Sequence, residues 1–203
     1  MINRKHFFDT VRASLFNGAM SKGQVGGMET ILKEWERQGL TDIRWLAYML
    51  ATTYHETAKT MQPIEEFSKG KGIRYGKKVK RSGIPYSSPD KLFYGRGFVQ
   101  LTWYENYDTM GRLLGIDLLN NPELALVPEH ATAIMFEGMT KGNSHFGDFT
   151  GKSLEDYFND KREDWVWARS IINGKRKGEK LPDSAELIAG YGKKFYHALT
   201  VCN

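Results

Sequence analysis

The chain has 203 residues, of which 40% are hydrophobic and 26% are charged, and its formal net charge is +5. This balance is typical of an ordinary globular protein and excludes an intrinsically disordered one. No apolar run reaches the length that a membrane-spanning helix needs. The single cysteine, Cys202, excludes an intrachain disulfide and a cysteine-rich metal site. We therefore expect one domain over residues 1–203 and no insertion into a membrane.

Helical periodicity dominates the start of the chain. Apolar residues recur on one face of residues 5–15, which predicts an amphipathic helix and not a signal peptide. Ser21 and Gln24 have the spacing of a capping box, so a second helix is expected after them. Gly39 is the natural end of that helix, because glycine adopts the left-handed conformation that closes many helices.

A third helix is expected from residue 42 toward residue 62. Thr41 is its expected N-cap. Pro63 is expected to end it, because proline removes a backbone donor and clashes with the preceding turn. One stripe of this helix is apolar, so we expect burial along one side. The stripe consists of Leu46, Met49, Leu50 and Thr53.

Residues 67–90 are rich in glycine, lysine, serine and proline, which predicts an irregular loop or hairpin region around residues 67–100. Long loops of this kind are uncommon unless they are functional. Residues 69–81 contain seven basic residues and no acidic one. Such a run is either a solvated loop or a surface that favours anionic partners. It contains no recurring nucleic-acid-binding module, so we expect no nucleic-acid partner.

The remaining sequence predicts further helices separated by short turns. Their expected starts are marked by prolines or capping residues, namely Pro122, Pro128, Ser153 and Asp183, the last with Glu186 at capping-box spacing. Their expected ends are marked by glycines, namely Gly115 and Gly174. Residues 164–173 are expected to form one of these helices. The fold class that follows is mainly α, in one domain with an irregular middle.

Glu56 and Glu65 lie nine residues apart on either side of Pro63. On one continuous helix they would face opposite directions. If the helix stops before Pro63, the chain can fold back and bring the two carboxyls to face each other across a gap. Glycoside hydrolysis uses such a pair, one protonated and one ionised. Apolar neighbours around Glu56 and a polar loop around Glu65 would favour that division, whereas two solvated charges are the alternative interpretation.

Two other catalytic classes fit the sequence less well. A zinc-protease helix needs a second histidine four residues after the first. Lys59 occupies that position relative to His55, so we expect no metal site and no cofactor. Hydrolysis by a serine nucleophile lacks its usual sequence, because no G-x-S-x-G occurs in the chain.

Three blocks of sequence resemble the family-19 glycoside hydrolases, which include chitinases and phage endolysins. The blocks are "YHET" at 54–57, "FYGRGFVQLTWYENY" at 93–107 and "IING" at 171–174. The resemblance implies a lysozyme-like, mostly helical fold and an inverting mechanism. Glu56 then corresponds to the general acid, and Glu65 to the base that activates water. Glu66 stays open as the base, because a loop can present either of two adjacent glutamates.

The resemblance also implies roles for side chains around the pair. Thr102 falls where the family holds the attacking water. Cleft-wall and substrate-contacting positions fall on His55, Tyr94, Gln100 and Asn173. Arg96 lies between two glycines and either contacts the substrate or braces the cleft floor through buried hydrogen bonds. The chain departs from the family where it has "INGK" in place of the frequent "INGG".

These observations predict a glycosidase that cleaves β-1,4 bonds in amino-sugar polymers. Peptidoglycan is the expected substrate and chitin the alternative, because the basic loop suits an anionic wall and no chitin-binding module is appended. We expect a monomer made in the cytoplasm without a signal peptide, which acts on the cell wall after its release. A non-catalytic wall-binding module on the same fold is the second class. The presence of both glutamates and Thr102 favours an enzyme.

Overall fold

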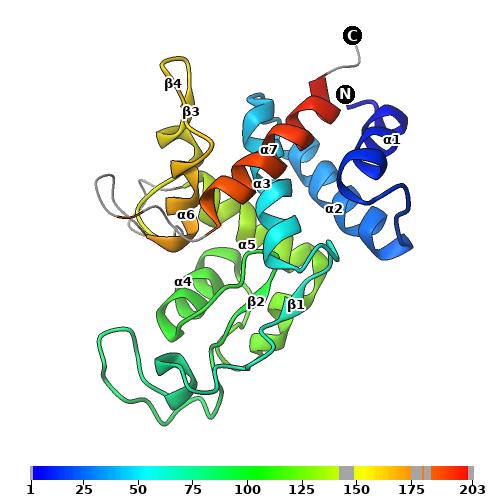
Figure 1. The fold of residues 1–203 in the computed structure, drawn as a ribbon. Helices are drawn as coiled ribbons and strands as arrows, with labels where there is room; N and C mark the ends of the chain where they lie inside the picture. Colours follow the sequence, from blue (N-terminus) through cyan, green and yellow to red (C-terminus); the bar gives the residue numbers. More distant parts are fainter. Residues whose placement is uncertain (1, 142–148, 175–179, 181–183, 201–203) are drawn as a thin grey trace.

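The computed structural model describes residues 2–141, 149–174, 180 and 184–200. Within these ranges the chain is mainly helical, as the sequence predicts (Figure 1). The α-helices are Arg4–Leu15 (α1), Lys22–Gln38 (α2), Ile43–Glu56 (α3), Tyr104–Leu114 (α4), Pro128–Thr140 (α5), Ser170–Asn173 (α6) and Ala185–Thr200 (α7). Two small antiparallel sheets pair Ile64–Glu65 (β1) with Arg96–Gly97 (β2) and Phe158–Asn159 (β3) with Arg162–Glu163 (β4). Short 3₁₀ helices cover Arg74–Lys77, Pro122–Leu126, Leu154–Asp156 and Trp167–Arg169.

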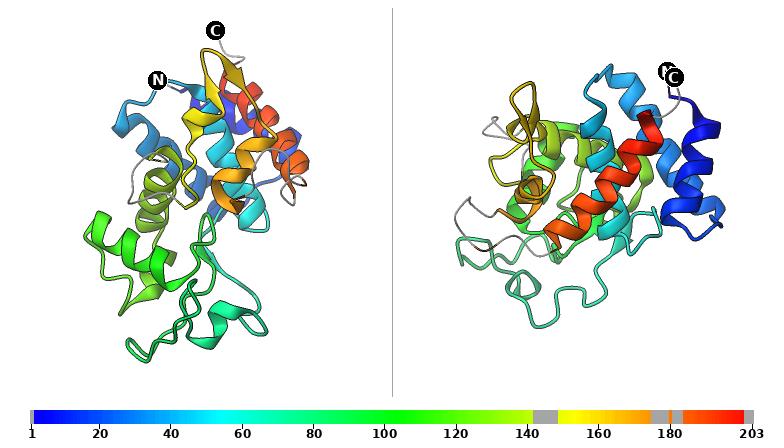
Figure 2. Two further views of the ribbon diagram at one scale, coloured as in Figure 1. Left: turned by 90° about the vertical axis from the view of Figure 1, so that its left-hand side faces the viewer. Right: turned by 45° about the horizontal axis from the view of Figure 1, so that its top comes forward.

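Helix α3 is the centre of the fold. Every residue from Leu46 to Tyr54 is buried, whereas the sequence predicted burial along one side. The reason is that α3 has neighbours on several sides. Helix α7 packs along it and α2 also contacts it, while α1 covers α7 (Figures 1 and 2). A helix surrounded in this way is apolar around its whole circumference.

Helix α3 begins one residue later than expected. Its N-cap is Asp42 and not Thr41, because the Asp42 carboxylate accepts a hydrogen bond from the backbone N–H of Arg44 at 3.0 Å. The same carboxylate also forms an ion pair with the guanidinium of Arg44. Asp42 therefore caps a free backbone N–H at the start of the helix and also pairs with the partly buried guanidinium of Arg44.

Helix α3 ends at Glu56, well before Pro63, so the expectation that Pro63 ends it was wrong. The end is a Schellman motif in which Ala58 adopts a left-handed φ of 49°. Two N–H groups bond back to carbonyls of the last turn, Ala58 to His55 at 3.2 Å and Lys59 to Tyr54 at 2.8 Å. The chain then turns into β1, and Glu56 is left as the last helical residue.

Strands β1 and β2 place the second glutamate. Glu65 pairs with Arg96, and Ile64 pairs with Gly97. Gly97 has a φ of 88°, and a Cβ atom at this position would lie 2.8 Å from the carbonyl oxygen of Ala125. Glycine is therefore required for β2 to lie this close to the 3₁₀ helix at Pro122–Leu126.

Most of the other expected boundaries are confirmed. The capping box of Ser21 and Gln24 is present, and Gly39 and Gly115 close α2 and α4 in left-handed conformations. Pro122 and Pro128 each start a helical segment. Asp183 lies outside the described residues. No helix in the part of the chain that the structure describes is long and apolar enough to span a membrane.

Two segments differ from the predicted helices. Ser153 caps only a 3₁₀ turn, which leads into the β3–β4 hairpin. Residues 164–173 form a 3₁₀ turn followed by the single turn α6. In both segments tertiary packing sets the local structure, because the Trp165 ring packs edge-to-face on Phe158 of β3 and at a tilt on Tyr48 of α3.

Candidate active site

A cleft of about 510 Å³ lies at the C-terminal end of α3. It brings together four residues that the sequence singled out, which are Glu56, Gln100, Thr102 and Asn173. Tyr75 and Arg81 of the irregular loop complete one wall, and Phe149, Thr150 and Arg169 contribute to the lining. Residues far apart in the sequence therefore meet here, and the expected acid is among them.

Glu56 is held at the cleft by an arginine. Arg169 Nη1 lies 2.5 Å from Glu56 Oε1, and the two side chains are 6% and 14% exposed. The two atoms form a close ion pair without the geometry of an aligned hydrogen bond. The sequence predicted apolar surroundings for Glu56, and the structure shows a cation instead. Charged side chains are rarely buried unless paired, so Arg169 in the apolar segment "WVWARSII" was the signal that sequence reasoning missed.

Glu65 is held ionised behind β1. Tyr94 donates to Glu65 Oε1 at 2.7 Å, and Lys69 Nζ lies 3.0 Å from Oε2. The hydrogen bond from Tyr94 and the nearby charge of Lys69 hold the pKa of Glu65 below its ordinary value. Glu65 is not among the residues that line the cleft around Glu56. Its ionised state matches the expected role of a base, and the facing of the two carboxyls stays a prediction.

Glu66 anchors the irregular loop. Its carboxylate accepts hydrogen bonds from Tyr75 Oη at 2.9 Å, from the backbone N–H of Gly95 at 3.2 Å, and from the hydroxyl of Ser68. Both of its oxygens are therefore occupied by neutral donors. This arrangement favours a structural role for Glu66 and leaves Glu65 as the better candidate for the base.

Tyr94 and Arg96 both contact the carboxylate of Glu65. Both side chains are buried, and neither lines the cleft. Arg96 bonds to the carbonyl of Leu92 and to Tyr107 Oη, each at 3.1 Å, and its Nε lies 3.3 Å from Glu65 Oε1. Burial and the bond to Glu65 raise the pKa of Tyr94, so its hydroxyl stays a donor. We assign both residues to positioning Glu65, and the buried bonds of Arg96 fit the bracing role that the sequence left open for it. Contact of either residue with the substrate stays a prediction.

The strained segment around Gln100 shapes the opposite wall. Gln100 and Trp103 have φ values of 54° and 80°, which are uncommon outside glycine and cluster at functional sites. Gln100 Nε2 donates to the carbonyls of Ile64 and Gly97 at 3.1 and 3.3 Å. A Cβ atom on Gly95 would lie 2.6 Å from Gln100 Oε1, so glycine is needed beside it.

Thr102 presents a hydrogen-bond acceptor to the cleft. Its hydroxyl donates its only proton to the carbonyl of Gln100 at 2.7 Å, which leaves its lone pairs to accept from another group. Asn106, which the sequence analysis did not single out, donates to the carbonyl of Thr102 at 2.8 Å and also lines the cleft. Its place four residues after Thr102, in the first turn of α4, was the available signal.

His55 does not line this cleft, although the charges of Glu56 and Arg169 act on it. It lines a separate pocket with Leu187 and Tyr191 of α7, on the other side of the helix end. Burial holds the pKa of His55 below its ordinary value. The structure therefore does not bring His55 together with Gln100, Thr102 and Asn173. In the described ranges no three histidine, cysteine, aspartate or glutamate side chains gather as a metal site would need.

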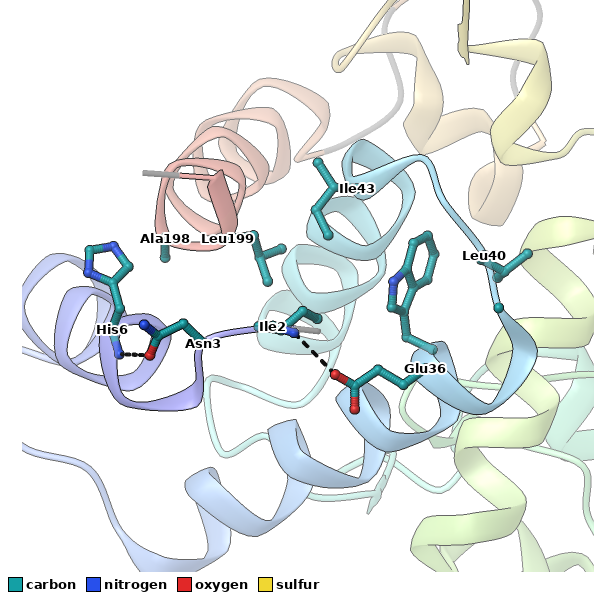
Figure 3. Close-up of a pocket in the computed structure, with 10 residues that line it drawn as sticks. Ile2, Asn3, His6, Glu36, Leu40, Ile43, Ala198 and Leu199 are labelled. Atoms are coloured by element: carbon teal, nitrogen blue, oxygen red, sulfur yellow. Dashed lines mark hydrogen bonds between the residues drawn. The ribbon is translucent and has the colours of Figure 1, made fainter. Parts of the chain in front are cut away.

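A larger cavity of about 600 Å³ lies at the other end of the molecule (Figure 3). It is bounded by α1, α2, the start of α3 and the end of α7. The carboxylate of Glu36 in its wall already bonds to Arg4 and to the backbone N–H of Ile2. Asn3 and His6 also line this cavity, but Glu36 is the only carboxylate among its described lining residues and is already bonded, so we place the candidate two-carboxylate chemistry at the cleft.

A family model described as chitinase class I, of glycoside hydrolase family 19, matches residues 38–196. The chain belongs to this family. The matched region contains both glutamates, the segment around Gln100 and Asn173, so the whole cleft described above falls within the family 19 domain.

Named family 19 proteins match parts of the chain. An endochitinase of Arabidopsis thaliana is 31% identical over 121 residues, which are 58% of this chain and 40% of that protein. Endochitinase 1 of Theobroma cacao and inactive chitinase-like protein 1 of Hevea brasiliensis are each 57% identical over 37 residues, which are 18% of this chain and 12% of those proteins. The chain thus spans less than half the length of these curated relatives.

Solved structures of family 19 proteins share the fold over nearly the whole chain. A bacterial family 19 chitinase superposes with a TM-score of 0.57 at 19% identity, covering 98% of this chain and 95% of that one. A class IV chitinase from Zea mays gives a TM-score of 0.60 at 18% identity, covering 95% and 92%. These similarities show that the mainly α, lysozyme-like architecture is that of family 19.

Proposed function

We propose that this protein hydrolyses β-1,4 bonds in polymers of N-acetylated amino sugars by an inverting, two-carboxylate mechanism. The observation that carries the proposal is the contrast between the two glutamates. Glu56 opens into the cleft beside Gln100, Thr102 and Asn173 and pairs with Arg169, whereas Glu65 lies outside that lining, where Tyr94 and Lys69 lower its pKa. Two carboxyls in different environments are what acid and base roles require.

In this mechanism Glu56 acts in its protonated form, and its proton passes to the oxygen of the leaving sugar. Glu65 takes a proton from a water molecule that attacks the anomeric carbon from the opposite face. The Thr102 hydroxyl accepts a hydrogen bond from that water, because its own proton is already given to the carbonyl of Gln100. Asn173 and Asn106 offer amide groups to the N-acetyl and hydroxyl groups of the sugar.

The comparisons support chitin as the glycan more than the peptidoglycan that the sequence led us to expect. The Arabidopsis and cacao relatives are named endochitinases, and the structural neighbours are named chitinases. Peptidoglycan is the second candidate substrate. It is favoured by one observation, which is that the basic residue Arg81 lines the cleft.

A non-catalytic binding role is the contrasting class of function. The Hevea relative, whose name calls it inactive, is as similar over its 37 matched residues as the cacao endochitinase. Local identity therefore does not separate an enzyme from a binder in this family. The presence of Glu56 in the cleft and of ionised Glu65 supports an enzyme.

The test is digestion of N-acetylglucosamine oligomers and of purified peptidoglycan side by side, with the products identified by mass spectrometry. Shorter oligomers from the first substrate support a chitinase, and muropeptides from the second support a wall hydrolase. Absence of any product from both substrates, with a folded protein, would contradict the proposed activity.

A further inference from the structure

Among the residues that the structure describes, one cation of the cleft lining makes no ion pair, namely Arg81. Three of the described lining residues are charged, namely Glu56, Arg169 and Arg81. Glu56 and Arg169 pair with each other. Within the described part of the chain the exposed guanidinium of Arg81 makes no hydrogen bond and no ion pair. The lining therefore has a net positive charge located at Arg81.

Arg81 is the last residue of the basic loop, which we define as residues 69–81. Two cations of this loop are paired, Lys69 with Glu65 and Lys78 with Asp90. The other five have no carboxylate partner among the described residues, and they are Lys71, Arg74, Lys77, Lys80 and Arg81. The positive charge of Arg81 thus continues into a wider positive surface beside the cleft.

The basic loop is fixed against the cleft wall. The ring of Tyr75 packs edge-to-face on Trp103 with centroids 5.5 Å apart. The guanidinium groups of Arg74 and Arg81 each lie 5.8 Å from the centre of the same Trp103 ring. The backbone N–H of Arg81 also donates to Glu105 at the start of α4, at 2.8 Å. Arg81 is therefore positioned before any ligand binds, which lowers the entropy cost of using it.

We infer that Arg81, with Arg74 behind it, forms a subsite for a carboxylate carried by the glycan in the cleft. The inference rests on the proposed function and names its substrate class. A polymer of N-acetylglucosamine offers a guanidinium only neutral oxygen acceptors and no opposite charge. A carboxylate offers that charge, and it matches the planar donors of arginine in a two-point contact. The cleft is therefore suited to acidic amino-sugar polymers over neutral ones.

Two chitin derivatives with the same backbone test this preference. Carboxymethyl chitin carries carboxylates, and glycol chitin carries neutral hydroxyethyl groups. Binding is measured by calorimetry with the Glu56→Asp variant, which shortens the acid to slow hydrolysis and keeps a carboxylate to neutralise Arg169. We expect tighter binding of carboxymethyl chitin, and we expect this preference to weaken as salt rises. Arg81→Gln is expected to reduce the preference by about fivefold, the upper range for an exposed charge pair.

Lys161→Gln is the matched control. Lys161 is an exposed cation in the β3–β4 turn, at the far end of the molecule from the basic loop (Figure 1). The Lys161→Gln substitution removes one positive charge, as Arg81→Gln does. It is expected to leave the preference for carboxymethyl chitin unchanged. The Arg81 variant is expected to fold, because only its backbone N–H bonds to Glu105. Equal binding of the two polymers, or an equal loss of preference in both variants, would overturn the inference.

Binding of random-sequence DNA is a separate control. DNA binding as tight as that of carboxymethyl chitin would also overturn the inference, since it would show a non-specific basic surface.

Binding of peptidoglycan strands shows which chemical group carries the carboxylate that Arg81 recognises, the stem peptide or the lactyl group of the sugar. Binding is compared for intact glycan strands and for strands whose stem peptides have been removed by an amidase, which leaves a free lactyl carboxylate on the sugar. A loss in Arg81→Gln confined to intact strands assigns the carboxylate to the peptide. A loss confined to the peptide-free strands assigns it to the lactyl group, which is an amide in intact strands. A loss on both strands shows that Arg81 binds either carboxylate. No loss on either strand contradicts the inference.

Failure of the inference and failure of the proposed function give different results. Hydrolysis of glycol chitin and carboxymethyl chitin at equal rates by the unchanged protein, with no binding preference, leaves the proposed function and removes the subsite. A binding preference for carboxymethyl chitin without hydrolysis of any polymer supports the carboxylate subsite and contradicts the proposed enzymatic activity.

Discussion

The guanidinium of Arg169 lies 2.5 Å from the carboxylate of Glu56, and it joins the 3₁₀ turn before α6 to the last residue of α3. Both side chains are largely buried at this contact. A buried cation is costly without a counterion. Glu56 therefore stabilises the cleft in addition to its proposed role as the acid.

Glu56→Gln is expected to lose hydrolysis and some stability together. The amide has no acidic proton to give, so turnover should fall by about 10²–10⁴-fold. Arg169 loses its counterion, which should lower the free energy of unfolding by about 1–3 kcal/mol. Activity assays and thermal unfolding measure both effects. Glu123→Gln, at an exposed position, is the control, and wild-type activity in Glu56→Gln would remove the mechanism.

Tyr94→Phe is expected to shift the acid side of the pH–activity profile to higher pH. The hydrogen bond from Tyr94 is the first cause that lowers the pKa of Glu65, so removing it raises that pKa. The base must be ionised to act, and it then becomes protonated at a higher pH. The same bond contributes folding stability above the ordinary carboxyl pKa, and this contribution is lost as pH falls through the lowered pKa.

Tyr86→Phe serves as the control for that profile. It removes a tyrosine hydroxyl that bonds to the carbonyl of Lys91 at 3.1 Å, without contact to Glu65. The pH–activity profile of this variant should match that of the unchanged protein. A shift of equal size in both variants would show that the loop, and not the bond to Glu65, sets the acid side.

Much of the fold was readable from the sequence because it depends on local chemistry. The capping box of Ser21 and the closing glycines Gly39 and Gly115 act within one helical turn, and they were placed correctly. The end of α3 was misplaced, because a Schellman motif with Ala58 in the left-handed position has no clear sequence signature. The helix-breaking property of proline led us to place the end of α3 at Pro63. By that residue the chain has already left the helix and leads into β1.

The site was only partly readable for a related reason. Glu56, Gln100, Thr102 and Asn173 were found as members of recognisable blocks, and the structure places them in one cleft. Arg169 was missed, because its significance depends on a contact between segments more than 100 residues apart in the sequence. Such a contact follows from packing and leaves no local pattern.

Glu65→Gln and Glu66→Gln are expected to separate the two candidate bases. Loss of a general base costs about 10²–10⁴-fold in turnover, and we expect this for Glu65→Gln. Glu66 holds Tyr75 and the backbone of Gly95, so Glu66→Gln should reduce turnover by less than about 10²-fold, the lower limit for losing a base. Initial rates on one soluble oligomer compare the variants. The opposite order would make Glu66 the base.

Thr102→Val is expected to lower kcat more than it changes KM. Valine keeps the shape of threonine but lacks the oxygen that is proposed to hold the attacking water. Loss of one such hydrogen bond costs about 1 kcal/mol, or roughly fivefold in rate. Thr102→Ser keeps the oxygen and should retain most of the activity. A change confined to KM would show that Thr102 binds the sugar instead.

The stereochemistry of the product tests the central claim most directly. An inverting enzyme places water between its base and the sugar, so a β-linked substrate gives an α product. Proton NMR of N-acetylglucosamine oligomers, recorded early in hydrolysis before the anomers equilibrate, measures the product formed first. We expect the α anomer. A β anomer would mean retention of configuration, and the assignment of Glu65 as the residue that activates water would be wrong.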